Sequence, residues 1–152
     1  MKAVKTRLET ITVGNGYANT IPTGAVQRFR QSGLSTRLVP FIWIKEMGEE
    51  SKDGPTGGAQ LITNKLLVSL GVGTRQDEVS DTRSGDEVMN SLRGDVVKAM
   101  LIEPRTFGGK AISCAYLGSA EIDVEEGEPD MGIRMDFEVL YRHRADDPTA
   151  IT

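Results

Sequence analysis

The hydrophobic positions of the first dozen residues follow a helical period. Val4, Leu8 and Ile11 recur three or four residues apart, so they share one stripe of an α-helix while charged residues take the other faces. The segment 13–16 (VGNG) ends the predicted helix, because Gly and Asn adopt the left-handed conformation that many helix C-termini need. A helix this short depends on packing for its stability.

Two predicted strands follow. Residues 25–31 alternate, with Phe29 opposite Val26, which is typical of an edge or half-buried strand. Residues 38–47 (LVPFIWIKEM) are almost continuously apolar and rich in β-branched and aromatic side chains, as in a strand covered on both faces. Pro40 has no amide N–H to donate, so we expect regular pairing to begin after it.

A polar segment at 48–58 (GEESKDGPTGG) separates this strand from the next. Because both flanks have strand character, the sequence predicts a β-hairpin with a long polar tip. The returning strand covers 59–75 and places on one face Leu66, Val68, Leu70 and Val72. Gly71 and Gly73 lie on the other face and indicate a bulge or a close backbone approach.

The clearest element is a second helix. Its start at 84–87 (SGDE) fits a capping box, in which a serine caps a free amide and a glutamate reaches back to the chain. One broad apolar stripe follows, formed by Val88, Met89, Leu92, Val96, Val97, Met100 and Leu101. We expect Arg93, Asp95 and Lys98 to point away from this stripe, and Pro104 to end the helix.

Two further strands complete the pattern. Residues 112–124 alternate apolar or small side chains on one face, and 125–132 (EEGEPDMG) form a turn. Residues 133–141 then alternate apolar and charged side chains, the cleanest two-residue period in the chain. This pattern predicts a hairpin with one buried face and one charged face that is solvated or lies between subunits.

The order helix, three strands, helix, two strands predicts an α+β fold. We expect a mostly antiparallel β-sheet with two α-helices packed on one face, formed by residues 1–144 as a single domain, and a flexible tail at 145–152. The 152 residues suffice for one hydrophobic core. No apolar run approaches the roughly 20 residues that span a bilayer, and the start of the chain lacks the apolar region of a signal peptide.

The composition limits the kinds of functional site that the chain can form. The chain has one cysteine and one histidine, so we expect no disulfide framework, metal site or catalytic triad, and we expect no cofactor. Its net charge of −4 argues against a general nucleic-acid-binding protein. We expect Cys114 to be a small buried hydrophobe. His143, between Arg142 and Arg144, fits a solvated or partner-facing basic patch better than a general base.

Carboxylates gather near the second predicted hairpin. The residues are Glu121, Asp123, Glu125, Glu126, Glu128 and Asp130. Their order does not match a calcium-binding loop, so they form either a solvated tip or an acidic surface that meets a basic partner or repels DNA. The glycines at 54–58 and 71–73 lack the spacing of phosphate-binding loops.

Two other sets of residues could suggest ligand binding, but the sequence does not favour that role for either. Arg28, Arg30 and Arg37 with Phe29 fit single-strand nucleic-acid binding, but the negative net charge and an aromatic content of 5% argue against it. Trp43 lies among apolar residues, as in a core or a subunit interface.

Charge is unevenly distributed along the chain. Residues 1–50 hold 7 Lys and Arg against 4 Asp and Glu, whereas residues 76–130 hold 5 against 13. Opposite charges on two parts of one subunit suit head-to-tail contacts around a ring.

Two segments resemble a known family. Residues 6–17 (TRLETITVGNGY) are similar to the first helix and following turn of phage tail-terminator (tail-completion, minor tail protein U-like) proteins. Residues 137–148 (FEVLYRHRADDP) resemble their last strand, with its Tyr-Arg and Asp-Pro ending. The order of elements between them is also similar, so the resemblance covers nearly the whole chain. The segments 48–58 and 125–130 match no shared pattern.

The resemblance implies a structural virion protein that forms a homohexameric ring in the tail or neck, assembled in the host cytoplasm. Such a ring caps the tail tube and joins it to a head–tail connector or stopper protein, while DNA passes through the lumen without specific binding. On this basis we expect the acidic residues between Glu121 and Asp130 to face the lumen or an adjacent ring. We expect Arg134, Arg142 and Arg144 to lie on an intersubunit or tube-facing surface.

Three alternatives remain. The nearest is a head-completion or connector-adaptor protein of the same neck. An enzyme such as a small hydrolase would need converging polar groups with shifted pKa values, and the sequence shows no such set. A small regulatory or nucleic-acid-binding module would show salt-sensitive DNA binding.

Overall fold

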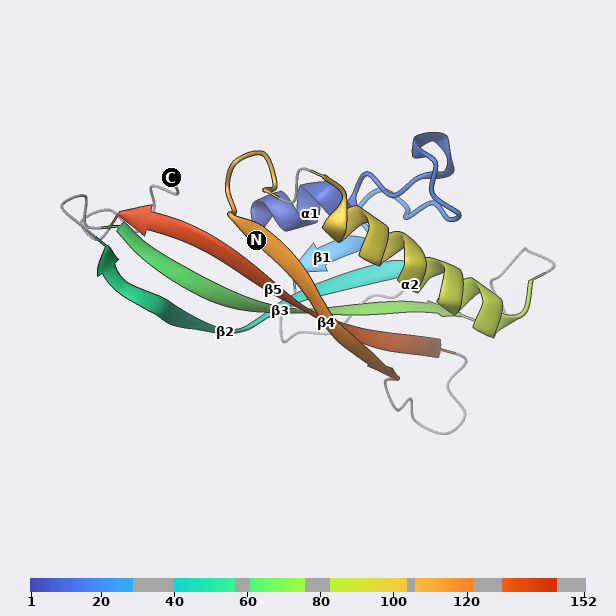
Figure 1. The fold of residues 1–152 in the computed structure, drawn as a ribbon. Coiled ribbons are helices and arrows are strands. Elements are labelled where there is room, and N and C mark those ends of the chain that lie inside the picture. Colours follow the sequence, from blue (N-terminus) through green and yellow to red (C-terminus); the bar gives the residue numbers. More distant parts are fainter. Residues whose placement is uncertain (29–39, 57–60, 76–82, 104–105, 122–129, 145–152) are drawn as a thin grey trace.

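The structure is a computed structural model, and it describes residues 1–28, 40–56, 61–75, 83–103, 106–121 and 130–144. The elements in chain order are α1 (Lys2–Leu8), the 3-10 turn η1 (Val13–Asn15), β1 (Val26–Arg28), β2 (Phe41–Thr56), β3 (Leu61–Arg75), α2 (Gly85–Leu101), β4 (Ser113–Glu121) and β5 (Asp130–Arg144). Five strands form one sheet in the order β1-β2-β3-β5-β4, and both helices lie on the same face of it (Figure 1). The predicted α+β fold is confirmed.

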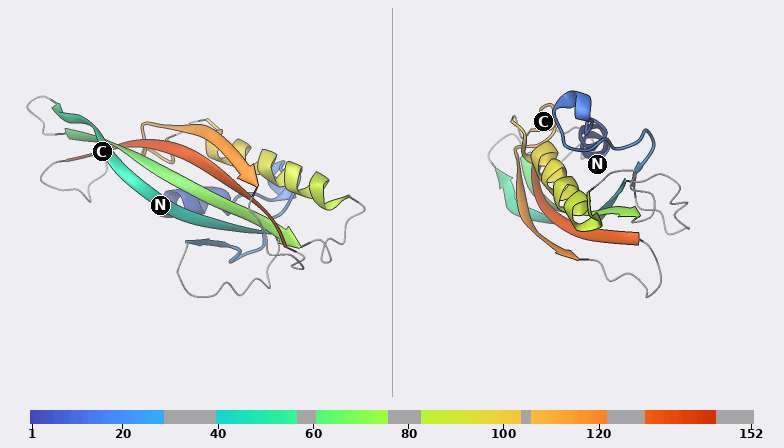
Figure 2. Two further views of the ribbon diagram at one scale, coloured as in Figure 1. Left: turned by 90° about the horizontal axis from the view of Figure 1, so that it is seen from below. Right: turned by 90° about the vertical axis from the view of Figure 1, so that its right-hand side faces the viewer.

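Antiparallel pairing dominates the sheet. β2 with β3, β3 with β5 and β4 with β5 are antiparallel, and only the short β1 runs parallel to its neighbour β2. The three central strands are 15 or 16 residues long and extend past α1 as a curved arm (Figures 1 and 2). We define this arm as residues 48–56, 61–67 and 138–144.

The arm corrects one sequence prediction. The polar segment 48–58 was expected to be a hairpin tip, but β2 continues through it to Thr56 and pairs with β3. A backbone ladder needs hydrogen-bond partners rather than apolar side chains, and three register shifts along β2 accommodate the irregular sequence. Residues 57–60 lie outside the described residues, as do 29–31 of the predicted first strand, 122–124 of the predicted fourth strand and the tail at 145–152.

The core lies between the helices and the covered face of the sheet. The predicted alternation on β3 and β5 is confirmed, since Leu70, Met135 and Phe137 are fully buried beneath α2. The α2 stripe is confirmed as well, with fully buried positions at Leu92, Val96 and Met100. Figure 2 shows α1 beside α2 on this face, where α1 contributes the buried Leu8. None of the described helices is both long and apolar enough to cross a membrane.

The predicted capping box starts α2. The Glu87 amide N–H donates to Ser84 Oγ at 3.3 Å, and the Ser84 amide N–H donates to Glu87 Oε2 at 2.9 Å. Both bonds satisfy donors that would otherwise lack a partner at the helix start. The sequence therefore located this helix boundary correctly.

Asp95 contradicts the helical pattern. It was expected to point away from the core, but it is buried, with 6% of its surface exposed. Its carboxylate accepts hydrogen bonds from the Ala18 amide at 3.0 Å, the Asn19 amide at 2.8 Å and Asn19 Nδ2 at 2.8 Å. The carboxylate thus joins the segment after η1 to α2. Arg93 and Lys98 are exposed, as predicted.

Replacing Asp95 tests this connection. Asp95→Ala leaves the two buried donors of Asn19, and the part-buried amide of Ala18, without their acceptor, so we expect the free energy of unfolding to fall by about 2–3 kcal/mol. Urea denaturation monitored by circular dichroism measures the change. The exposed Arg93 of the same helix is the control, since Arg93→Ala should change stability by less than about 0.5 kcal/mol. Equal stability of the two variants would contradict the anchoring role.

Candidate functional site

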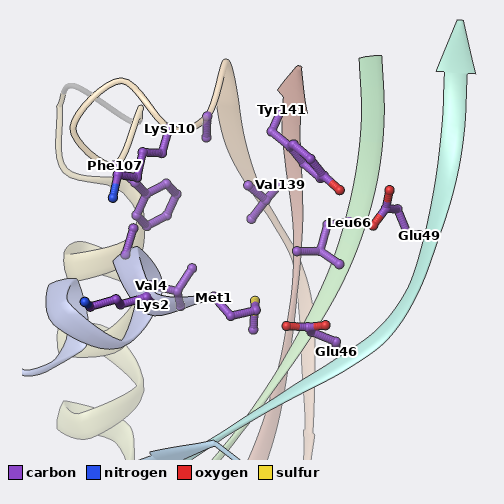
Figure 3. A pocket seen from close by; sticks show the side chains of 12 residues that line it. Met1, Lys2, Val4, Glu46, Glu49, Leu66, Phe107, Lys110, Val139 and Tyr141 are labelled. Carbon is purple, nitrogen blue, oxygen red and sulfur yellow. The ribbon is translucent and has the colours of Figure 1, made fainter. Parts of the chain in front are cut away.

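A pocket opens where the arm passes α1. It has a volume of about 360 Å³ and lies between α1, the loop at 106–111 and the covered face of the sheet (Figure 3). Apolar side chains in its lining include Val4, Leu66, Phe107 and Val139. Glu46 and Glu49 stand on β2 at one side of the opening, and Lys2 and Lys110 lie at the other (Figure 3). The pocket therefore combines an apolar lining with opposite charges at its rim.

Arg7 holds the pocket loop in place. Its guanidinium lies 5.0 Å from the centre of the Phe107 ring and donates to the carbonyl oxygens of Ala99 and Ile102 at the end of α2. A cation at a helix C-terminus is stabilised by the unsatisfied carbonyl groups there. Phe107 has a backbone φ of 48°, a conformation that residues other than glycine rarely adopt. The contacts of Arg7 thus help to hold a strained aromatic residue against the core.

A polar network crosses the arm beside the pocket. Asn64 Nδ2 on β3 donates to Glu49 Oε1 on β2 at 2.7 Å and approaches Tyr141 Oη on β5 at 3.5 Å. Burial, followed by the hydrogen bond to Glu49, raises the pKa of Tyr141 above its usual value of 10, while the contact with Asn64 opposes the shift. The network therefore favours the protonated form of the phenol, which joins β5 to β2 and β3.

The two candidate reactive side chains occupy structural positions. Cys114 is 2% exposed and belongs to the core, as predicted. His143 is half-buried on β5, with its ring 6.2 Å from the ring of Tyr141. Within the described residues, no three side chains of His, Cys, Asp or Glu gather in a way that would hold a metal ion. The pocket lining has no cysteine or histidine, so it offers no nucleophile–base pair of those residue types.

The second face of the sheet carries charges in place of helices. Both described helices pack on the opposite face (Figure 2). On the open face, Lys65 pairs with Glu138 at 3.1 Å and Arg134 pairs with Asp136 at 3.4 Å. Arg142 Nε donates to Thr63 Oγ1 at 3.2 Å. The predicted division of the last strand into a buried and a charged face is confirmed.

The charged residues that the sequence singled out lie at two different ends of the sheet. Glu121 is exposed at the end of β4, and Asp130 begins β5 near it; Asp123, Glu125, Glu126 and Glu128 lie outside the described residues. Of the predicted basic residues, Arg134 lies near this acidic end, because it pairs with Ala120 of β4. Arg142 and Arg144 lie at the end of the arm. Residue 142 lies twelve positions after 130 along the strand, which corresponds to roughly 40 Å.

Comparison with known proteins identifies a shared fold. No family model matches the chain, and no curated protein matches it. Among solved structures, a chain from the virion of a native gene transfer agent particle matches with a TM-score of 0.51 and 14% sequence identity. The alignment covers 91% of this chain and 91% of that chain. The two proteins therefore share the arrangement of their elements over almost their whole length.

The raised pKa of Tyr141 can be tested by titration. Subtracting the ultraviolet titration of a Tyr141→Phe variant from that of the native chain should leave one phenol with a pKa above 10. Because the folded-state pKa is raised, the associated stability is present below pH 10 and is lost as pH rises through the folded pKa. Glu49→Gln should lower this pKa, since the carboxylate raises it. A difference titration centred at or below 10 would contradict the network.

Proposed function

We propose that this chain is a structural protein of a tailed-phage virion, which works through contacts with copies of itself and with neighbouring proteins. The observation that carries the proposal is the fold shared with a virion chain over nine-tenths of both proteins. The architecture agrees with this role, because a charged open face and a long arm provide surface for contacts. The described pocket, by contrast, has no cysteine or histidine in its lining.

Within that class, we propose a tail terminator: a ring of six copies that caps the tail tube and meets the head–tail connector. The support is the resemblance of residues 6–17, which include the end of α1 and η1, and of residues 137–148, of which 137–144 belong to β5 and 145–148 lie outside the described residues. The charge arrangement adds to it. An acidic end and an arm with Arg142 and Arg144 lie at opposite ends of one sheet, which suits head-to-tail contacts between neighbours.

The acidic end also fits a DNA passage. Carboxylates repel phosphate groups, so a lumen lined with them would let DNA move without binding it. We place Glu121 and its acidic neighbours in sequence at the lumen or against an adjacent ring. The arginines of β5 then face a neighbouring copy or the tube.

Electron microscopy of the purified full-length chain tests the proposal. We expect six-membered rings, or tail tubes capped at one end when the tube protein is added. Rings that bind the connector and leave tubes uncapped would favour a head-completion or connector-adaptor protein instead. A monomer that binds DNA tightly, with an affinity that falls steeply as salt rises, would contradict a structural role and indicate a nucleic-acid-binding module.

Charge substitutions test the two surfaces. Glu121→Lys and Arg142→Glu change exposed positions, so we expect each to alter the free energy of unfolding by less than about 1 kcal/mol. Both should reduce the yield of rings or capped tubes at least tenfold (about 1.4 kcal/mol at one contact). Arg93→Glu on the exposed side of α2 is the matched control and should assemble normally. Normal assembly of all three variants would contradict the placement of these surfaces.

A further inference from the structure

β4 forms one edge of the sheet. It pairs with β5 on one side and ends the strand order on the other, so its outer side has no neighbouring strand in the part of the chain that the structure describes. A strand in this position presents a row of backbone donors and acceptors that another strand can pair with. Proteins that stay monomeric usually block such an edge with charges, proline or bulges.

The opposite edge of the same sheet is blocked in this way. Beyond its short pairing with β1, the outer side of β2 runs from Lys45 to Thr56 and carries six charged residues and one proline in sequence. Three register shifts also interrupt its regularity. By contrast, residues 113–120 of β4 (SCAYLGSA) contain no charged residue and no proline. β4 has one bulge, between Tyr116 and Gly118, and the four residues on either side of it keep a regular register.

The exposed surface of β4 is complementary to itself. Its central residue is Leu117, an apolar side chain with 53% of its surface exposed. If two copies of β4 run antiparallel about Leu117, this residue meets Leu117 of the second copy. Ala115 then lies opposite Ser119, and Ser113 lies opposite Glu121, so no like charges meet. A two-fold contact requires such self-complementarity of one patch.

We propose that the outer edge of β4 is a self-recognition surface, which pairs antiparallel with β4 of a second copy of this chain about a two-fold axis at Leu117. The bulge between Tyr116 and Gly118 divides the pairing into two short ladders, one on each side of the axis. Burial of the two Leu117 side chains against each other supplies apolar contact at the centre. Because the ladders are short, we expect a dimer that dissociates on dilution.

The inference goes beyond the proposed function. A ring uses head-to-tail contacts, whereas this contact joins identical surfaces, so the dimer is a separate state of the free chain. Its test does not depend on a tail tube or a connector. A failure of one proposal therefore leaves the other standing.

Cysteine cross-linking gives the sharpest test. In a Cys114→Ala background, Leu117→Cys places two thiols beside the two-fold axis, and mild oxidation should convert most of the chain to a covalent dimer. The control is Val13→Cys in the same background, since Val13 is 62% exposed on η1, away from β4. We expect at least a tenfold lower dimer yield for the control. Equal yields for the two variants, or no dimer from Leu117→Cys, would overturn the proposal.

A non-covalent measurement supplements the cross-linking. Sedimentation velocity of the native full-length chain should show a dimer that grows with concentration. Leu117→Lys should shift the protein to a monomer with an unchanged circular dichroism spectrum, because a charge at the axis meets its own copy. Ile102→Lys changes another exposed apolar residue, 46% exposed after α2, and should leave the dimer intact. A Leu117→Lys variant that dimerises like the native chain would contradict the pairing.

Discussion

The fold depends on the burial of one face of a five-stranded sheet under two helices. Side chains such as Met135 and Phe137 on β5 are fully buried beneath α2, while Asp136 and Glu138 between and beside them form ion pairs on the open face. Burial of apolar surface is the main favourable contribution to folding, so this contact determines which side of every strand is available for other roles. The charged face, the pocket and the arm are consequences of a sheet larger than its two helices.

The same constraint shapes the part of the sheet that the helices do not cover. The sheet extends past α1, and its backbone ladder continues through the polar segment of β2 as far as Thr56. Glu49, Asn64 and Tyr141 join three strands there through side-chain hydrogen bonds. Under the proposed function, the polar side chains of this arm would meet neighbouring subunits. The pocket at its base is rimmed by charges from α1, β2 and the loop at 106–111.

Local patterns predicted most of the fold and less of the candidate site. The alternation along β5 and the capping box at Ser84 were confirmed, because both depend on residues close in sequence. The pocket was not anticipated, since it joins α1, β2, β3 and β5 across long sequence separations. No local signal marks Glu49 and Tyr141 as partners. Glu121 and Arg142 were identified as charged surface residues, and their roles in assembly remain predictions.

The sequence alone determined the order of elements, the α+β class and the buried face of β3 and β5, because a period of two or 3.6 residues is a property of the local chain. Residues 38–47 were expected to be covered on both faces, but Lys45 and Met47 of β2 are exposed. Tertiary structure decided the length of β2 and the burial of Asp95. A polar strand is stable only when a neighbouring strand pairs with it, and a buried carboxylate only when distant amides reach it. Both conditions depend on where the folded chain brings its remote segments.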